Sequence, residues 1–384
     1  MVVTVSRAET FLRSVASRQV VTSGRLSESG WVLDNGELRH GSADFFRVIG
    51  ARDHDGVEHL LFDQPEAALV GLVVTGPPGR RRVLVNARAE PGLHEGAQFS
   101  ATVQSSPSNY EQRHGGKPTP FLGEILHLAN NARVIHDSVQ YDWGRYYRAK
   151  TKRFRVIEID DETPAPVPLL WVNHDELDLL LRSDRRTTVD LRCIALALRC
   201  SDAGLSSVTT VTPERESEKA LEQVSLTSLT RWVLDDEGVH DSRGERSVHW
   251  FTTQTSTREI ERWTQPLMVL DRDVSIVATV RRENGRILLA VRRETAVGLE
   301  GRMVWGLAEN VGSGSSSRPV MLSAEGGRFF RHGVSLALSD NERAIDEAVW
   351  MSREEALALV TADLCTSLEF RLAVGLLETK ENSW

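Results

Sequence analysis

The octapeptide WVLDNGEL at residues 31–38 returns, little changed, as WVLDDEGV at residues 232–239. VLVNARAE, which ends at Glu90, is matched in the same order by ILLAVRRE, which ends at Glu294. The two offsets are 201 and 204 residues. Solenoid repeats have periods of about 20–50 residues, which excludes that architecture. The sequence therefore predicts one domain that is present twice.

A later match shows that the two copies differ in length. GRYYR at residues 144–148 is matched by GRFFR at 327–331, now at an offset of 183. The stretch from Glu90 to this motif takes 54 residues, whereas the stretch from Glu294 takes 33. The second copy has therefore lost a segment. We expect an active pocket in the first copy and a vestigial pocket in the second.

The repeat sets the expected domain boundaries. We predict a first copy over residues 1–200, a linker over 201–224 and a shortened second copy over 225–384. The linker is polar and mixes Gly, Ser, Thr and Pro, which is typical of a boundary. A chain of 384 residues is long enough for two cores of ordinary domain size.

Strand-like and helix-like patterns follow one another in the same order in both copies. Short segments rich in Val, Ile and Phe, such as FRVIEI at 154–159, predict strands. Asn173 stands three residues before Glu176, and Ser352 three before Glu355, each opening a Leu-rich amphipathic run. This spacing predicts two capped helices. Strands followed by helices predict an α+β fold.

The composition excludes several classes of protein. Hydrophobic residues make up 40% and charged residues 26%, which is typical of a globular chain. A net charge of −8 disfavours a nucleic-acid coat or a binder of anionic membranes. Three cysteines without a Cys-x-x-Cys pair disfavour a disulfide framework or a cysteine zinc site. With no signal peptide and no apolar run of membrane-spanning length, we expect a soluble cytoplasmic protein.

Several catalytic motifs are absent from the sequence. There is no GxGxxG after a predicted strand, no GxxxxGK[ST], no HExxH and no GxSxG. These absences disfavour nicotinamide enzymes, P-loop enzymes, zinc proteases and serine hydrolases. We expect no metal and no redox cofactor.

The densest polar stretch runs from Ala89 to Phe121. Loops that mix acids, amides, a phenol and an imidazole are poor core material and good ligand-binding material. A long solvated loop is the alternative interpretation. The candidate residues of this stretch are Glu90, Thr102, Gln104, Ser108, Asn109, Tyr110 and His114.

A second candidate stretch, VQYDWGRYYRAKTKRFRVIEI at 139–159, combines cations with aromatic residues. On a strand, alternate cations share one face, where they could neutralise a diphosphate. A solvated strand face is one alternative. Single-stranded nucleic acid, stacked on the aromatic rings, is another, and the acidic net charge disfavours it.

Together these stretches resemble the NDP-hexose 2,3-dehydratases of antibiotic deoxysugar pathways. The family's EPGN, PTVQ-x-x-x-SNY and His-Gly elements are similar to Glu90–Leu93, 101–110 and His114-Gly115. Its LQSEQG-x-WF-x-x-KRNRN element is similar to VQYDWGRYYRAKTKRF at 139–154, and SEEGGRF to SAEGGRFF at 323–330. FF-x-V-x-G and Gln-Pro elements match residues 45–50 and 64–65.

The resemblance implies a fold, an oligomer and a reaction. The fold is two tandem Nudix-like α/β/α domains without the Nudix metal box, and the oligomer is a homodimer. The reaction removes water across carbons 2 and 3 of a dTDP-linked 4-keto-6-deoxyhexose and gives a 3,4-diketo sugar. Because the keto group acidifies the hydrogen on carbon 3, the enzyme needs a base, an acid and donors for an enolate oxygen.

Residue chemistry suggests roles within this resemblance. His114 or Tyr110 would handle the proton on carbon 3, and Asp142 or Glu90 would serve the departing hydroxyl. The sugar hydroxyls and the keto oxygen would be held by Thr102, Gln104, Ser108 and Asn109. Lys150 and Arg153 would meet the diphosphate, and Arg88 and Gln140 complete the predicted binding set.

The chain also departs from the family pattern. Leu93 replaces Asn, Arg88 replaces Lys and Asp142 replaces Glu, and further changes lie at Tyr141, Trp143, Lys152 and Phe154. The chain is therefore a divergent member. Two alternatives follow: a nucleotide-sugar enzyme that catalyses another dehydration or an isomerisation, or an inactive protein that binds nucleotide sugars.

Overall fold

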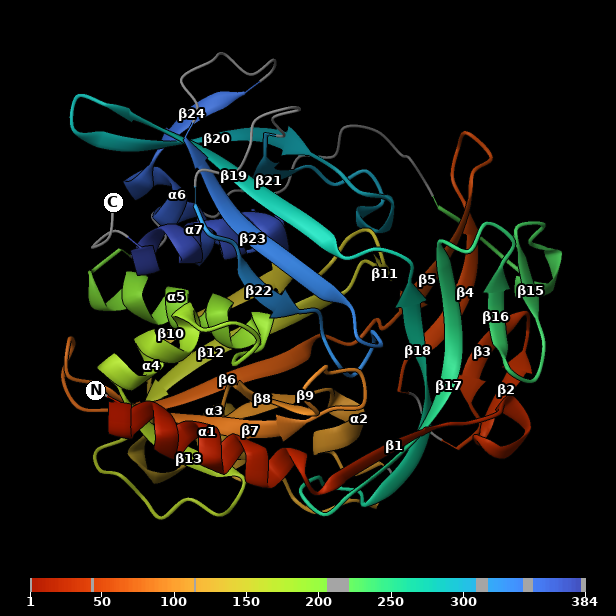
Figure 1. Ribbon diagram of the computed structural model, residues 1–384, viewed down its shortest axis with the longest axis horizontal. Coiled ribbons are helices and arrows are strands. Elements are labelled where there is room, and N and C mark those ends of the chain that lie inside the picture. The colour runs from red at the N-terminus through yellow and green to blue at the C-terminus, as the bar shows by residue number, and fades with distance from the viewer. Residues whose placement is uncertain are drawn as a thin grey trace.

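The structure of the chain is a computed structural model that describes residues 2–42, 45–113, 115–205, 221–308, 317–340 and 348–380. His114 and most of the expected linker 201–224 lie outside the described residues. The fold is mixed α+β, as predicted, with more strands than helices in the described part (Figure 1). Within that part, no helix is long and apolar enough to cross a membrane.

Each half of the chain contains one large sheet. In the first half the strands run in the order β10-β12-β6-β7-β13, with β8 beside β7 and β9 beside β6. The bounds are β6 (Ala68–Thr75), β7 (Arg82–Ala89), β8 (Ala97–Ser100), β9 (Val103–Ser105), β10 (Arg133–Tyr141), β12 (Thr151–Glu158) and β13 (Leu169–Asn173). The short helices α2 (Pro107–Tyr110) and α3 (Leu122–His127) lie between β9 and β10 along the chain.

The large sheet of the second half has the same order. Its strands run β22-β23-β19-β20-β21, with β24 also paired with β20. In both sheets the central pair is parallel, β12 with β6 and β23 with β19. The bounds are β19 (Val274–Glu283), β20 (Arg286–Glu294), β21 (Val304–Leu307), β22 (Val320–Ser323), β23 (Gly333–Asp340) and β24 (Val349–Ser352).

Two smaller sheets lie on the right of Figure 1 and exchange strands between the halves. β14 lies just before residue 225, the expected start of the second half, but pairs with β4 of the first half. β1 lies near the start of the first half but pairs with β17 of the second half. One sheet contains β2 (Trp31–Asp34), β3 (Glu37–His40), β4 (Arg47–Arg52), β5 (Glu58–Asp63), β11 (Tyr147–Arg148) and β14 (Glu222–Val224). The other contains β1 (Gln19–Ser23), β15 (Trp232–Leu234), β16 (Gly238–Asp241), β17 (Arg246–Thr255) and β18 (Arg262–Leu270).

Four helices, α4 (His174–Arg182), α5 (Val189–Asp202), α6 (Arg353–Thr361) and α7 (Leu368–Lys380), pack between the two large sheets. α5 packs on the first sheet, α7 packs on the second, and the two helices contact each other. α4 and α6 flank them, and α1 (Val2–Ala16) packs on β7 and β8. Both predicted capping boxes form, at Asn173 with Glu176 and at Ser352 with Glu355.

Reciprocal backbone hydrogen bonds join the halves at two glycines. The amide of Gly92 donates to the carbonyl of Gly326, and the amide of Gly298 donates to the carbonyl of Gly144, both at 2.8 Å. Gly92 and Gly298 must lack a side chain, because an added Cβ would lie 1.7 Å from a backbone oxygen of the other half. These contacts relate Gly144 to Gly326, positions 182 residues apart, one fewer than the 183 residues between the GRYYR and GRFFR motifs.

Candidate active site

A cavity of about 400 Å³ lies where the two halves of the chain meet. The first half contributes side chains from β2, β3, β6, β7, β9, α2 and β12 and from the connections near them. The second half contributes the β17–β18 connection, β18 and residues 325–328. The lining includes aromatic, charged and amide side chains: Trp31, Phe46, Gln64, Arg88, Glu90, Gln104, Asn109, Lys152, Arg258, Glu259, Arg262, Trp263, Glu325 and Arg328.

Part of the lining is aromatic. Trp31 lies 4.9 Å from Phe46 between ring centroids, and its indole nitrogen donates to the carbonyl of Thr264 on β18. The guanidinium of Arg328 lies 3.7 Å from the centre of the Phe46 ring and donates to Gln64 at 3.1 Å. The flat aromatic rings suit a planar nucleotide base. The Arg328 guanidinium has no carboxylate of the described residues at hydrogen-bond distance, so it is suited to binding a phosphate.

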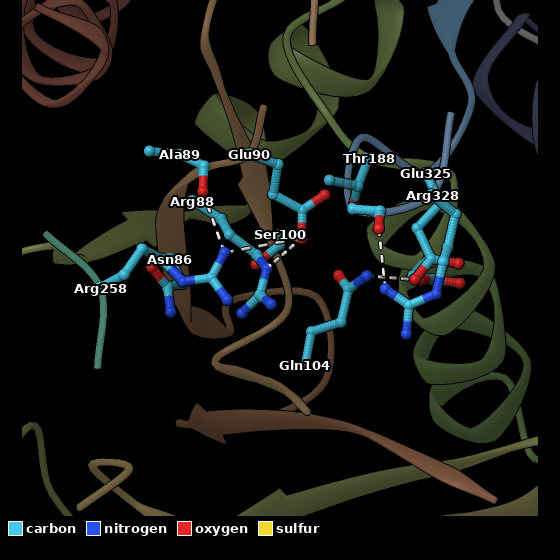
Figure 2. A network of polar contacts seen from close by, with 12 residues as sticks. Asn86, Arg88, Ala89, Glu90, Ser100, Gln104, Thr188, Arg258, Glu325 and Arg328 are labelled. Atoms are coloured by element: carbon cyan, nitrogen blue, oxygen red, sulfur yellow. Dashed lines mark hydrogen bonds and ion pairs between the residues drawn. The ribbon is translucent and has the colours of Figure 1, made fainter. Parts of the chain in front are cut away.

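Arg88 on β7 and Glu90, directly after this strand, form a buried ion pair in the cavity wall. Arg88 and Glu90 are two positions apart, so both side chains lie on one face of the strand. Arg88 Nε lies 2.6 Å from Glu90 Oε1 (Figure 2). Arg258, from the second half, donates to the carbonyl of Ala89 at 2.9 Å.

Glu259, the next residue along the chain, also lines the cavity. Burial would raise the pKa of Glu259, but the charges of Arg258 and Arg88 outweigh it and lower that pKa to about 2.

A cluster of five largely buried charged residues, which we call the Lys152 cluster, forms and supports another part of the wall. Lys152 Nζ lies 2.9 Å from Asp142, 2.8 Å from Asp190 and 3.3 Å from Glu325. Lys150, on the same face of the chain, lies 2.9 Å from both Asp142 and Glu325. Of these five residues, Lys152 and Glu325 line the cavity.

The mutual charges of the Lys152 cluster fix its protonation. Burial would raise the pKa of Glu325, but Lys150 and Lys152 outweigh it and hold that pKa well below its usual range. The same two cations lower the pKa of Asp142 against its burial. Among the three acids of the cluster, burial prevails only at Asp190, whose pKa is raised although Lys152 opposes the shift. Glu325 and Asp142 are therefore ionised at neutral pH.

Four of the predicted site residues line the cavity: Arg88, Glu90, Gln104 and Asn109. Asp142 and Lys150 lie one layer behind, in contact with Glu325 or Lys152 of the wall. The Ser108 hydroxyl lies 2.9 Å from that of Ser106, which does line the cavity.

Other predicted site residues hold the fold together. The Thr102 hydroxyl joins two strands, accepting from the amide of Val73 and donating to the carbonyl of Leu84. The Gln140 amide donates to the carbonyls of Val360 and Ala362, at the end of α6. Neither side chain lines the cavity.

The structure also puts Arg153 and Tyr110 away from the cavity. Arg153 forms a surface ion pair with Asp137 on the adjacent strand β10. Tyr110 packs on a separate apolar cluster that includes Leu69 and Ile125. No described residue tests His114, because it lies outside the described ranges.

Sequence reasoning missed the contribution of the second half. Glu325 and Arg328 lie in SAEGGRFF, a motif noticed as a repeat of the first half and therefore treated as vestigial. The sequence marks Lys152 only as a strand cation and as a departure from the family pattern, not as a site residue. Arg258 and Glu259 carry no sequence signal, because only the pairing of β17 with β18 brings their connection to the cavity.

Comparison with known proteins identifies the first half. Residues 9–198 match the family model described as NDP-hexose 2,3-dehydratase. Over these 190 of its 384 residues the chain is similar to this dehydratase family. All first-half residues that line the cavity lie inside the matched range, whereas the second-half lining residues, including Glu325 and Arg258, lie outside it.

Three curated members of the dehydratase family are similar to the chain, each named dTDP-4-dehydro-6-deoxy-alpha-D-glucopyranose 2,3-dehydratase. The protein of Streptomyces violaceoruber is 28% identical over 289 residues, covering 67% of this chain and 64% of that protein. That of Saccharopolyspora spinosa is 24% identical, covering 70% and 60%, and that of Amycolatopsis orientalis is 26% identical, covering 65% and 56%. The chain thus spans about three fifths of the length of these relatives.

Among solved structures, a Nudix hydrolase from M. smegmatis, RenU, aligns with 33% of the chain and 81% of its own length. The identity is 16% and the TM-score is 0.19. A likeness at this level carries no argument about the fold.

Proposed function

We propose that this chain removes water across carbons 2 and 3 of a dTDP-linked 4-keto-6-deoxyhexose and releases a 3,4-diketo sugar. The observation that carries the proposal is the cavity itself, which combines a buried Arg–Glu pair from the family-matched half with a buried lysine. The names of the three relatives support the substrate class.

The reaction defines what the lining must do. A base removes the proton from carbon 3, and the electrons move to the oxygen on carbon 4. The enolate then expels the hydroxyl on carbon 2, which leaves as water after it receives a proton. The resulting enol becomes a ketone at carbon 3, so the sugar loses one water and no electrons.

We assign the enolate oxygen to Lys152. A buried ammonium group that is already in position stabilises developing negative charge without reorganisation. Glu90, a carboxylate paired with Arg88, accepts a hydrogen bond from the departing hydroxyl and orients it, and the proton that this hydroxyl needs is the one that the base takes from carbon 3. Asp142, the other candidate for the hydroxyl, has a lowered pKa and lies behind the wall, so it neither donates a proton nor reaches the hydroxyl. Glu325 is a weak base for the same reason and acts instead as a counter-charge to Lys150 and Lys152.

We keep His114 as the base that removes the proton from carbon 3, an assignment that rests on the sequence alone. Tyr110 is the poorer candidate, because it packs on an apolar cluster outside the cavity lining and burial raises the pKa of its phenol. We transfer the diphosphate contacts from Lys150 and Arg153 to Arg262 and Arg328, which line the cavity.

Mass spectrometry tests the proposal. With dTDP-4-keto-6-deoxyglucose as substrate, we expect a product lighter by one water. Glu90→Gln should lower kcat by about 10²-fold, because the amide no longer orients the departing hydroxyl as the carboxylate does. Arg153→Ala is the matched control and should leave turnover unchanged. Binding without any change of mass would favour the inactive nucleotide-sugar binding protein; a product of unchanged mass would favour an isomerase.

We propose that the reaction needs no metal. Elimination next to a ketone can be catalysed by an acid, a base and a fixed cation, and Lys152 supplies the cation. Within the described residues, a grouping that could hold an ion is Asp53, His54 and Asp55, which does not line the cavity. Turnover should survive dialysis against EDTA; restoration by added Zn²⁺ or Mg²⁺ after a loss would overturn this.

We also propose that the halves arose by duplication of one Nudix-like α/β/α domain. The shared strand order of the large sheets, the parallel central pairs and the reciprocal glycine contacts support it. The resemblance to the dehydratases further supports a cytoplasmic homodimer, which light scattering of the purified chain would test.

A further inference from the structure

Two acceptor oxygens in the cavity wall lack a hydrogen-bond partner among the described residues. They are Oε2 of Glu90 and Oε1 of Gln104, and both atoms are buried. Both residues line the cavity, and Glu90 is 3% and Gln104 7% exposed. A buried acceptor without a partner is unfavourable, so native structures rarely leave one unless a ligand or water completes it.

In Glu90 and in Gln104, the other polar atom of the side chain already has a hydrogen-bond partner. Arg88 holds Oε1 of Glu90 at 2.6 Å, which leaves Oε2. The amide nitrogen of Gln104 lies 2.7 Å from Oδ2 of Asp190, which leaves Oε1. In Figure 2 the dashed line meets the Gln104 nitrogen, and its oxygen points to the side where Arg88 and Glu90 lie.

The orientation of the Gln104 amide follows from the surroundings of Asp190. Lys152 Nζ lies 2.9 and 2.8 Å from the two oxygens of Asp190, so both oxygens already act as acceptors. An acceptor cannot receive the carbonyl end of an amide, so Gln104 must turn its NH₂ group toward Asp190. Asp190 is 1% exposed near the start of α5, where a carboxylate is favoured by the helix dipole.

We propose that Asp190 is a positioning residue that makes Gln104 a hydrogen-bond acceptor toward the cavity. Gln104 Oε1 and Glu90 Oε2 then select a ligand that offers two hydroxyl donors at this wall, in place of a keto oxygen. That these donors are the hydroxyls of a nucleotide-linked sugar rests on the proposed function. Gln104 therefore contributes to substrate specificity, and the C4 keto group lies elsewhere, toward Lys152.

A pair of isosteric variants tests the orientation. In Asp190→Asn, the remaining oxygen accepts from Lys152 and the new NH₂ group faces Gln104, so Gln104 flips and presents a donor to the cavity. We expect KM for dTDP-4-keto-6-deoxyglucose to rise by about tenfold, the effect of one mismatched hydrogen bond, with a smaller change in kcat.

The double variant Asp190→Asn/Gln104→Glu restores an acceptor. The carboxylate introduced at position 104 accepts from the new amide with one oxygen and presents the other to the cavity, and the pair keeps its net charge. We expect KM to return to within about threefold of the original value. If Asp190 were only structural, the double variant would be no better than Asp190→Asn, and that result would overturn the proposal.

A measurement without ligand separates this inference from the proposed function. The side-chain NH₂ of Gln104, assigned by its loss in Gln104→Glu, should give a shifted, slowly exchanging pair of ¹⁵N-correlated signals that Asp190→Asn abolishes. An exposed-type signal insensitive to Asp190→Asn would overturn the inference even if turnover is found. Failure to turn over any 4-keto sugar, with the shifted signal present, would overturn the proposed function and leave the positioning of Gln104 supported.

Discussion

Lys152 is the residue on which the charge of the cavity wall depends. It lies within hydrogen-bond distance of Asp142 and Asp190 and near Glu325, and all four side chains are largely buried. It is also one of two departures from the family pattern that line the cavity, the other being Arg88. The divergence of this chain therefore reaches the wall that we propose contacts the substrate.

Replacing Lys152 should damage both stability and activity. Lys152→Met leaves Asp190 without its cation, and the loss of one partner of a buried pair costs about 3 kcal/mol. Urea denaturation checks this. Arg153→Met is the control, because the neighbouring Arg153–Asp137 pair is at the surface and contributes about 0–1 kcal/mol. Equal destabilisation by the two changes would contradict the buried network.

Glu259 should make stability depend on acidic pH. Its pKa falls from 4.5 to about 2 in the folded chain, so its contribution is complete above the unfolded pKa of 4.5 and is lost as pH falls toward 2. Between pH 7 and pH 3 the original chain should lose about 2 kcal/mol more than Glu259→Gln, as urea denaturation at each pH would show. Glu261→Gln, two residues away and exposed, is the control and should behave like the original chain.

The candidate site was partly predictable at the level of single residues. Glu90, Gln104 and Asn109 were found because acids and amides in a Gly- and Pro-rich stretch are poor core material. The same criterion also selected Thr102, whose hydroxyl instead joins two strands. Sequence shows that a polar side chain is present, but its direction depends on which strands pair.

At the scale of elements, residue patterns within one helical turn correctly predicted where two helices begin. Both capping boxes form where a Ser or Asn stands three residues before Glu, because the partners are one helical turn apart. The exchange of β1 and β14 between the halves was not predicted, because it depends on pairings between residues that are 170 or more positions apart along the chain. The GRYYR and GRFFR motifs are 183 residues apart, whereas the glycine contacts relate positions 182 apart, because the adjacent glycines 326 and 327 leave the alignment ambiguous.

The glycine contact between the halves should be sensitive to a single methyl group. In Gly92→Ala the new Cβ would meet the Phe329 carbonyl at 1.7 Å, so backbone must move and the Arg88–Glu90 wall with it. We expect a loss of about 3 kcal/mol or more, as for other changes that force overpacking. Gly375→Ala in α7 is the matched control: its Cβ has ordinary contacts, and helix propensity should stabilise the chain by up to about 1 kcal/mol. Thermal unfolding compares the two.

At the scale of the whole molecule, neither half is complete alone. Residues 1–205 expressed separately lack β17 beside β1, β14 beside β4 and the Glu325 carboxylate beside Lys152. We expect each half to aggregate when expressed alone, and residues 1–205 and 221–384 to co-purify and regain turnover when expressed together. Size-exclusion chromatography and the mass assay check this. An active, monodisperse first half would contradict it and would favour a dispensable second copy.

The exchanged strands have a consequence for synthesis on the ribosome. β1 leaves the exit tunnel more than 220 residues ahead of β17, which at about 5–20 residues per second is a delay of roughly 10–50 s. Throughout that time the nascent chain carries a strand without its partner, open to chaperones or to a neighbouring nascent chain. Slow codons before residue 255 would lengthen this interval, so yield should respond to synonymous changes that leave the protein itself unaltered.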